Sequence, residues 1–170
     1  CGRILDPASK IATIAQNNDY YQPLTTCTNS FQAYDALDVV YQNKNRIIRA
    51  MNAAITKNLH RNPQVVFYDV SNFFFEIENP DEDIEENGKV IAGLRKKGVS
   101  KEHRPQPIVQ MGLFMDDTGL PISIETFPGN TLDQATLRPA LKSTLNGLDF
   151  NRFILVADRG LCSHKNNLYL

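Results

Sequence analysis

Apolar residues recur about one helical turn apart over the first third of the chain, which predicts helices there. A short helix is expected from Pro7 to Gln16, because the preceding aspartate can cap free N–H groups and proline fits the first helical position. Two amphipathic helices follow, the first after a Ser30 cap. Their apolar stripes are Phe31, Tyr34, Leu37 and Tyr41, and then Ile47, Ile48, Met51, Ile55 and Leu59. The second helix carries basic residues and no acidic one, so a cationic outer face is expected at Lys44, Arg46, Arg49, Lys57 and Arg61.

From Gln64 onward the pattern is that of strands. The stretch "QVVFYDVSNFFFE" is almost continuous in valine, tyrosine and phenylalanine, which predicts a strand buried on both faces, yet it contains Asp69. Two further strands, Ile108 to Met115 and Pro121 to Phe127, flank "DDTG", in which Gly119 can take the positive φ of a tight hairpin. A helix that Pro139 kinks or splits and the short strand in "RFILVADRG" come last.

The element order is therefore helices followed by β, β, β, α, β. This order predicts three antiparallel strands and a crossover helix leading to a fourth strand parallel to an earlier one. The expected division is a helical region, 1–62, and an α/β domain, 63–170, with a charged insertion at about 77–106. In this part of the chain, seven carboxylates from Glu76 to Glu86 come first, and six lysines and arginines between Lys89 and Arg104 come after them. Long loops in compact domains are more often functional or mobile than structural.

Composition limits which binding partners and which cellular compartment are expected. A net charge of -1 gives no general attraction to nucleic acid or membrane, so a local patch must hold any such partner. Three cysteines, Cys1, Cys27 and Cys162, match no zinc or disulfide framework and favour a reducing cytoplasm. No apolar run has the roughly 18 residues of a membrane span, so no membrane partner is expected. Because the sequence starts with cysteine and ends soon after a strand, we expect a fragment of a longer protein.

The candidate site consists of two aspartates, Asp69 inside the first apolar strand and Asp158 at the end of the last one. A lone buried carboxylate is costly, so a cation, a set of hydrogen bonds or a metal should compensate Asp69. If the fourth strand pairs with the first, the two carboxylates approach each other across 89 residues of sequence (158 − 69). Mg²⁺ or Mn²⁺, which prefers oxygen ligands, would then hold them together. The alternative for Asp158, which precedes Arg159, is a turn or capping role.

Several blocks together resemble one family. "FYDVSNFFFE", "LRKKGVSKEHRP" leading into "IVQMGLFMDDTGLPISIETFPGNTLD", and "VADRG" are similar to bacterial insertion-sequence transposases of the DDE class, whose catalytic domain has a ribonuclease H-like fold. The opening "GRILDPASKIATI" is similar to the helical region that precedes this domain in such transposases. The resemblance thus covers nearly the whole chain and implies a partial ribonuclease H-like fold after an α-helical region.

The resemblance also implies a site and a reaction. Asp69 and Asp158 match the family's first two catalytic, metal-binding carboxylates, which hold two Mg²⁺ or Mn²⁺ ions in the complete enzyme. The third is a glutamate on a later helix, and no residue up to Leu170 matches it; Glu76 and Glu125 lie in the wrong elements. The implied activity is metal-dependent cleavage and strand transfer of DNA, with element ends and target as partners and a homo-oligomer as the working form. This chain alone is expected to be inactive.

Basic residues near the insertion are candidate DNA contacts, namely Arg95, Lys96, Lys97, Lys101 and Arg104, together with Arg159. An equally open alternative is a solvated loop that balances the neighbouring acidic run. A phosphatase of the haloacid dehalogenase type is disfavoured because Ser71 stands where its second aspartate is needed. An actin-like ATPase is disfavoured because its glycine-rich phosphate loops are missing. A further alternative is a non-catalytic truncated remnant that binds DNA or an intact transposase.

Overall fold

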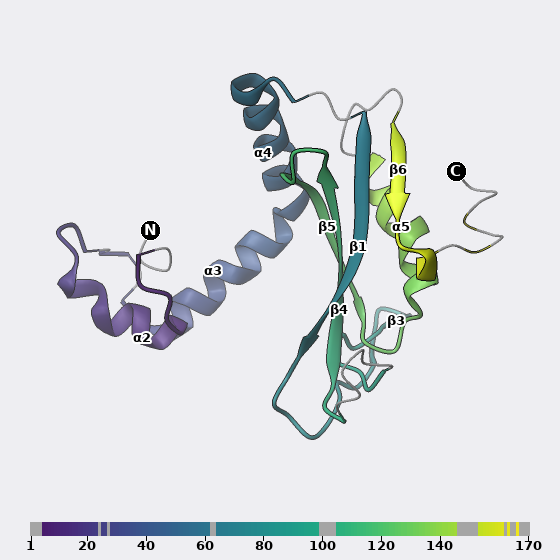
Figure 1. The fold of residues 1–170 in the computed structure, drawn as a ribbon. Coiled ribbons are helices and arrows are strands. Elements are labelled where there is room, and N and C mark those ends of the chain that lie inside the picture. Colours follow the sequence, from purple (N-terminus) through teal and green to yellow (C-terminus); the bar gives the residue numbers. More distant parts are fainter. Residues whose placement is uncertain are drawn as a thin grey trace. The chain divides into compact units, whose positions relative to one another are not determined.

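A computed structural model gives the fold of the chain (Figure 1). It describes residues 5–23, 25–26, 28–61, 64–98, 105–145, 153–161, 163 and 166. The chain divides into two compact units, Cys1–Ile47 and Ile48–Leu170, so the division falls inside a helix, whereas the sequence predicts a boundary between 62 and 63. That domain boundary stays a prediction. Among the described helices, none combines the length and the apolar character needed to cross a membrane.

The predicted N-terminal helices are present, with small differences at their ends. Helix α2 is Lys10–Ala15, followed by the short 3-10 helix η1, Gln16–Asp19. It begins later than predicted because Ser9, not Asp6, caps it: the Ala12 N–H donates to the Ser9 hydroxyl at 3.1 Å. Helix α3 is Ser30–Gln42, with its cap at Asn29, and helix α4 is Lys44–Leu59.

The second unit is built on a four-stranded sheet in the order β5-β4-β1-β6. Its strands are β1 (Val65–Phe74), β4 (Ile108–Asp116), β5 (Pro121–Pro128) and β6 (Ile154–Ala157). The pairs β1/β4 and β4/β5 are antiparallel, and β6 runs parallel to β1. Helix α5, Asp133–Leu145, makes the crossover, and the 3-10 helix η2, Arg159–Leu161, follows β6. The described part of the chain therefore confirms the α/β order predicted for a partial ribonuclease H-like fold.

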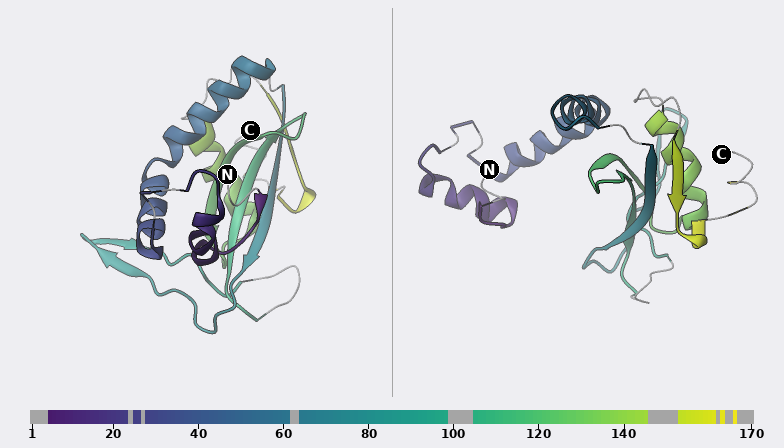
Figure 2. Two further views of the ribbon diagram at one scale, coloured as in Figure 1. Left: turned by 90° about the vertical axis from the view of Figure 1, so that its left-hand side faces the viewer. Right: turned by 45° about the horizontal axis from the view of Figure 1, so that its top comes forward.

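Strand β1 is buried on one face only, so the prediction of burial on both faces is wrong. Val66, Tyr68 and Val70 are buried, whereas Phe67 and Asp69 are exposed. The reason is that α5 lies along one face of the sheet (Figures 1 and 2) and packs on the residues of that face. Asp69 belongs to the opposite face.

Tyr68 is the largest side chain in the core beneath α5. Its ring centroid lies 4.5 Å from that of Phe114, and its hydroxyl donates to Thr136 Oγ1 of α5 at 2.9 Å. Gly112 on β4 makes room for this ring, since a Cβ there would lie 2.2 Å from the Tyr68 oxygen. The buried Leu137, Ala140 and Leu141 of α5 fill the rest of this layer, and the helix runs through Pro139 without being split.

The charged insertion contains a hairpin that the sequence analysis did not predict. Strands β2 (Ile84–Glu86) and β3 (Lys89–Ile91) pair antiparallel around Asn87 and Gly88, whose φ values are 53° and 72°. Positive φ at both central residues is the geometry that Asn-Gly favours in a two-residue hairpin loop. The chain then returns to the sheet, where Lys96 and Ile108 exchange backbone hydrogen bonds of 3.1 and 2.9 Å. Part of the insertion is therefore ordered structure.

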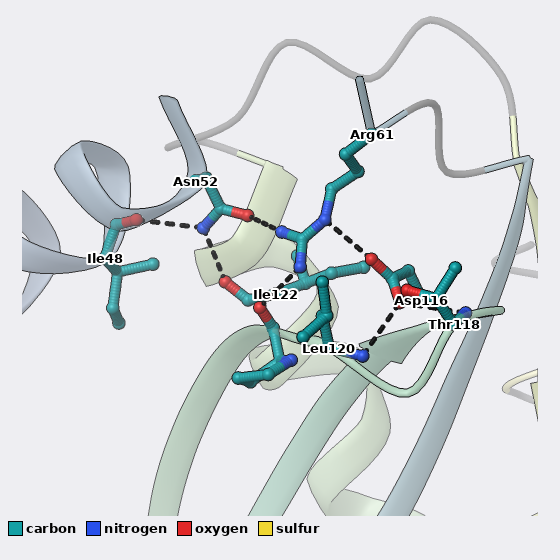
Figure 3. Close-up of polar contacts among 8 residues, drawn as sticks. Ile48, Asn52, Arg61, Asp116, Thr118, Leu120 and Ile122 are labelled. Atoms are coloured by element: carbon teal, nitrogen blue, oxygen red, sulfur yellow. Dashed lines mark hydrogen bonds and ion pairs between the residues drawn. The ribbon is translucent and has the colours of Figure 1, made fainter. Parts of the chain in front are cut away.

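A buried polar cluster ties the end of α4 to the β4–β5 turn (Figure 3). Arg61 Nε lies 2.7 Å from Asp116 Oδ2, and both side chains are almost fully buried, 3% and 2% exposed. The guanidinium also donates to the Asn52 side chain and to the Pro121 carbonyl, while Asn52 donates to the carbonyl of Ile122 at 2.7 Å. Arg61 is thus an internal residue, and its predicted place on a cationic outer face is wrong.

Candidate functional site

The parallel register of β1 and β6 brings the two predicted aspartates to neighbouring positions. Tyr68 and Ala157 are Cα partners, and Asp69 and Asp158 are the residues that directly follow them. Neighbouring strands lie about 4.7–4.9 Å apart, so the backbones at the two aspartates run side by side at the end of β6. The structure therefore brings the two aspartates to neighbouring backbone positions, and the approach of their carboxylates stays a prediction.

Asp69 and Asp158 have different surroundings. Asp69 lies inside β1 with its carboxylate exposed, and no described residue donates a hydrogen bond to it. Asp158 Oδ1 accepts from the Arg159 N–H at 2.7 Å, and the Asp158 carbonyl accepts from the Leu161 N–H at 2.9 Å. Asp158 thus has the capping role considered as its alternative, since it starts the turn of η2. That role occupies one carboxylate oxygen and is compatible with a ligand on the other.

A hard divalent cation fits the chemistry of this pair. Both side chains are exposed carboxylates, so the donor set consists of oxygen, which Mg²⁺ and Mn²⁺ prefer. Within the described ranges no group of three or more His, Cys, Asp or Glu residues could hold a metal. The pair therefore offers two carboxylates, with water or substrate oxygens needed to complete the coordination.

The basic residues near the insertion divide into paired and exposed ones. Arg95 Nε donates to Asp81 Oδ1 at 2.7 Å, and Lys96 Nζ lies 2.7 Å from Asp83 Oδ1. These hydrogen bonds lower the pKa of Asp81 and of Asp83 below their usual range. Lys97 is exposed. Arg95 and Lys96 therefore form ion pairs with the acidic run. This agrees with the alternative of a solvated loop whose charges balance one another.

Two of the predicted DNA contacts, Lys101 and Arg104, lie outside the described residues. Arg159 is exposed and is the first residue of η2, directly after Asp158. The structure thus brings Arg159 next to the aspartate pair and leaves Arg95 and Lys96 in the ion pairs of the insertion.

Comparison with known proteins gives distant structural likeness only. No protein-family model matches the chain, and no curated protein matches it. Among solved structures, the chain is similar to the Mos1 transposase paired-end complex with left transposon end, with a TM-score of 0.39 and 15% identity over 75% of this chain and 39% of that chain. It is also similar to the Mos1 mariner paired end complex with Mn, with a TM-score of 0.33 and 14% identity over 98% and 50% of the two chains. The chain thus spans at most half the length of these proteins.

The sequence analysis missed one polar feature close to the sheet, a cavity of about 530 Å³ beside the buried Arg61–Asp116 pair. Asp116 lies at the end of β4, and its Oδ1 accepts from Thr118 N at 3.0 Å and from Leu120 N at 2.8 Å. Burial raises the pKa of Asp116, but these hydrogen bonds and the charge of Arg61 outweigh it and lower the pKa below its ordinary value. Arg61 and Asp116 beside this cavity form an ion pair with each other, which supports a structural role.

Proposed function

We propose that the chain is part of a transposase of the DDE class and that Asp69 and Asp158 are two of its metal-binding, catalytic carboxylates. The observation that carries the proposal is the parallel β1–β6 register, in which each aspartate directly follows one of the partners Tyr68 and Ala157. The sequence blocks around both aspartates support the same assignment.

The two aspartates would bind the metal ion from differently positioned side chains. Asp69 lies in the β4 ladder opposite Leu113, one residue beyond Tyr68, where the ladder with β6 ends. Asp158 is oriented by the Arg159 N–H, which leaves Oδ2 for a ligand. Asp69 and the free Oδ2 of Asp158 would hold a divalent ion such as Mg²⁺ or Mn²⁺, which would supply Lewis-acid activation of a water or 3′-hydroxyl and charge stabilisation at the leaving oxygen. Arg159 is suited to contact a phosphate near the pair.

The proposal also covers the source of the protein, its compartment, its DNA partners and its oligomeric form. We infer a bacterial insertion-sequence enzyme of the cytoplasm that acts on element ends and target DNA as a homo-oligomer. The chain alone would hold metal loosely, because only two of the three carboxylates of such a site are assigned. A second candidate is a non-catalytic protein that binds DNA or an intact transposase.

Titration with Mn²⁺ tests the site directly. Asp69→Ala and Asp158→Ala should each weaken binding by roughly tenfold or more, as loss of a ligand costs at least what loss of a supporting residue does. Asp117→Ala is the matched control, because Asp117 is an exposed aspartate of the β4–β5 turn. Equal Mn²⁺ affinity in all three variants and the unchanged protein would contradict the proposal.

A further inference from the structure

Asp158 lies just beyond the strand ladder that brings it close to Asp69. Strand β6 ends at Ala157, and the last pair of its ladder with β1 joins Ala157 to Tyr68. The direction of the chain at Asp158 therefore depends on the turn that follows. In that turn the Asp158 carbonyl accepts from the Leu161 N–H at 2.9 Å, so the backbone of Asp158 follows the position of Leu161.

Leu161 is held both by its side chain and by its carbonyl group. The side chain is 3% exposed and belongs to the core cluster that includes Leu137 and Leu141 of α5. The carbonyl accepts a hydrogen bond from Asn166 Nδ2 at 2.8 Å in a buried setting. The turn η2 thus has one apolar and one polar attachment, and all the residues involved belong to the unit Ile48–Leu170.

Asn166 links this turn to the first turn of α5. It is 2% exposed, and its Nδ2 donates to the Gln134 carbonyl at 2.9 Å as well as to the Leu161 carbonyl. An amide nitrogen carries two hydrogens, so these two carbonyls use its full donor capacity. Its backbone N–H donates to Ser163 Oγ at 3.1 Å. Burial of an amide is costly unless it is hydrogen-bonded, and here both donors are matched to carbonyls on two different elements.

We propose that Asn166 is a positioning residue of the metal site and acts on Asp158 through Leu161. By holding the Leu161 carbonyl against the start of α5, Asn166 fixes η2, and η2 sets the direction in which the Asp158 side chain leaves the end of β6. The free Oδ2 of Asp158 would then be presented to an ion shared with Asp69. The inference rests on the proposed function, because it takes Asp158 as a ligand of a divalent ion.

Substitution of Asn166 tests the proposal through two measurements. Asn166→Ala removes both donors without changing the charge near the site. Hydrogen exchange of the Leu161 amide, followed by NMR, should become roughly tenfold faster or more, because the turn opens more often. The Mn²⁺ affinity, measured at a temperature at which the variant is folded, should fall by roughly tenfold or more, as for other groups that orient metal ligands. Asn166→Ser keeps one donor and should show both effects at smaller size, so it replaces Asn166→Ala if that variant does not fold.

Ser143→Ala is the matched control. It removes a hydrogen bond of α5 to Glu125 of β5, and so weakens the packing of the same helix without touching η2. It should lower the stability of the fold and leave both the Leu161 exchange rate and the Mn²⁺ affinity unchanged. Equal changes in Ser143→Ala and Asn166→Ala would overturn the proposal, because general loosening of α5 would then be the cause.

The remaining outcomes separate this proposal from the proposed function. Unchanged exchange of the Leu161 amide in Asn166→Ala would overturn the positioning role whether or not metal binds. Faster exchange with an unchanged Mn²⁺ affinity would also overturn it, because the turn would then not orient the ligand. Mn²⁺ binding that is insensitive to Asp158→Ala would overturn the proposed function and, with it, the role of Asn166 in metal binding, while the exchange of Leu161 would still respond to Asn166→Ala.

Discussion

At the scale of single residues, Tyr68 gives a prediction about pH. Burial raises the pKa of Tyr68 to about 12 from 10.0, although the hydrogen bond to Thr136 opposes the rise. Because the folded pKa lies above the unfolded one, the neutral phenol stabilises the fold below about pH 10. That contribution should fall by about 1.4 kcal/mol per pH unit between pH 10 and 12.

Urea unfolding of Tyr68→Phe, measured across this range, is the test. At neutral pH the variant should lose about 1 kcal/mol with the Thr136 hydrogen bond. Above pH 10 its free energy of unfolding should decline less steeply than that of the unchanged protein. Parallel curves for both proteins would show that Tyr68 does not govern the alkaline transition.

Gly112 gives a second prediction at this scale. Gly112→Ala should destabilise the protein by about 1–3 kcal/mol, because the new Cβ would lie 2.2 Å from the hydroxyl and 2.8 Å from ring atoms of Tyr68. Thermal unfolding measures the loss. In the Tyr68→Leu background the same substitution should cost much less, since the side chain it meets is gone. An equal cost in both backgrounds would rule out this contact as the cause.

At the scale of elements, the buried Arg61–Asp116 pair attaches the end of α4 to the β4–β5 turn (Figure 3). Asp116→Asn should destabilise the unit by about 3–5 kcal/mol, since it leaves the guanidinium buried without its counter-charge. The pKa of Asp116 is lowered in the fold, so its contribution is present above its unfolded pKa of about 3.8 and is lost as the pH falls further.

Urea unfolding at neutral and acidic pH checks both statements about this pair. The difference between Asp116→Asn and the unchanged protein should shrink as the pH falls below about 3.8. Asp117→Asn, one residue along in the same turn and exposed, should stay within about 0.5 kcal/mol. A loss of similar size in both variants would mean that the turn itself, and not the ion pair, is sensitive.

The sequence predicted those elements whose signals are local. Gly119, with φ of 82°, closes the β4–β5 hairpin within one residue of the predicted strand ends. The Asn87–Gly88 pair is an equally local hairpin signal. The charged residues around it favoured the prediction of a polar insertion instead. The exposure of Asp69 could not be predicted from its apolar neighbours, because it depends on α5 covering only one face of the sheet.

The candidate site was predictable in part for the same reason. The order of strands suggested that β6 pairs with β1, and the register of Tyr68 with Ala157 agrees with it. The partner of Arg61 could not be predicted, because Asp116 is 55 residues away (116 − 61) and only the tertiary structure brings the two side chains together. Long-range polar pairs of this kind leave no periodic signal in the sequence.

At the scale of the whole molecule, the net charge of -1 hides separate acidic and basic segments. The acidic run after β1 binds Arg95 and Lys96, so these cations are already neutralised by Asp81 and Asp83. DNA could recruit them only by displacing those carboxylates. Lys97 is exposed, so it can bind a phosphate without first displacing a carboxylate.

The last prediction follows from that difference and concerns the salt dependence of DNA binding. If the insertion contacts DNA, Lys97→Ala should reduce the slope of log affinity against log salt by about 1, the value for one lost phosphate contact. Arg95→Ala should leave the slope almost unchanged, because it removes a charge that Asp81 already compensates. Asp81→Ala should increase the slope, since it releases Arg95. A slope that is identical in all three variants would assign the insertion to the solvated, self-balancing loop and place any DNA contact elsewhere on the chain.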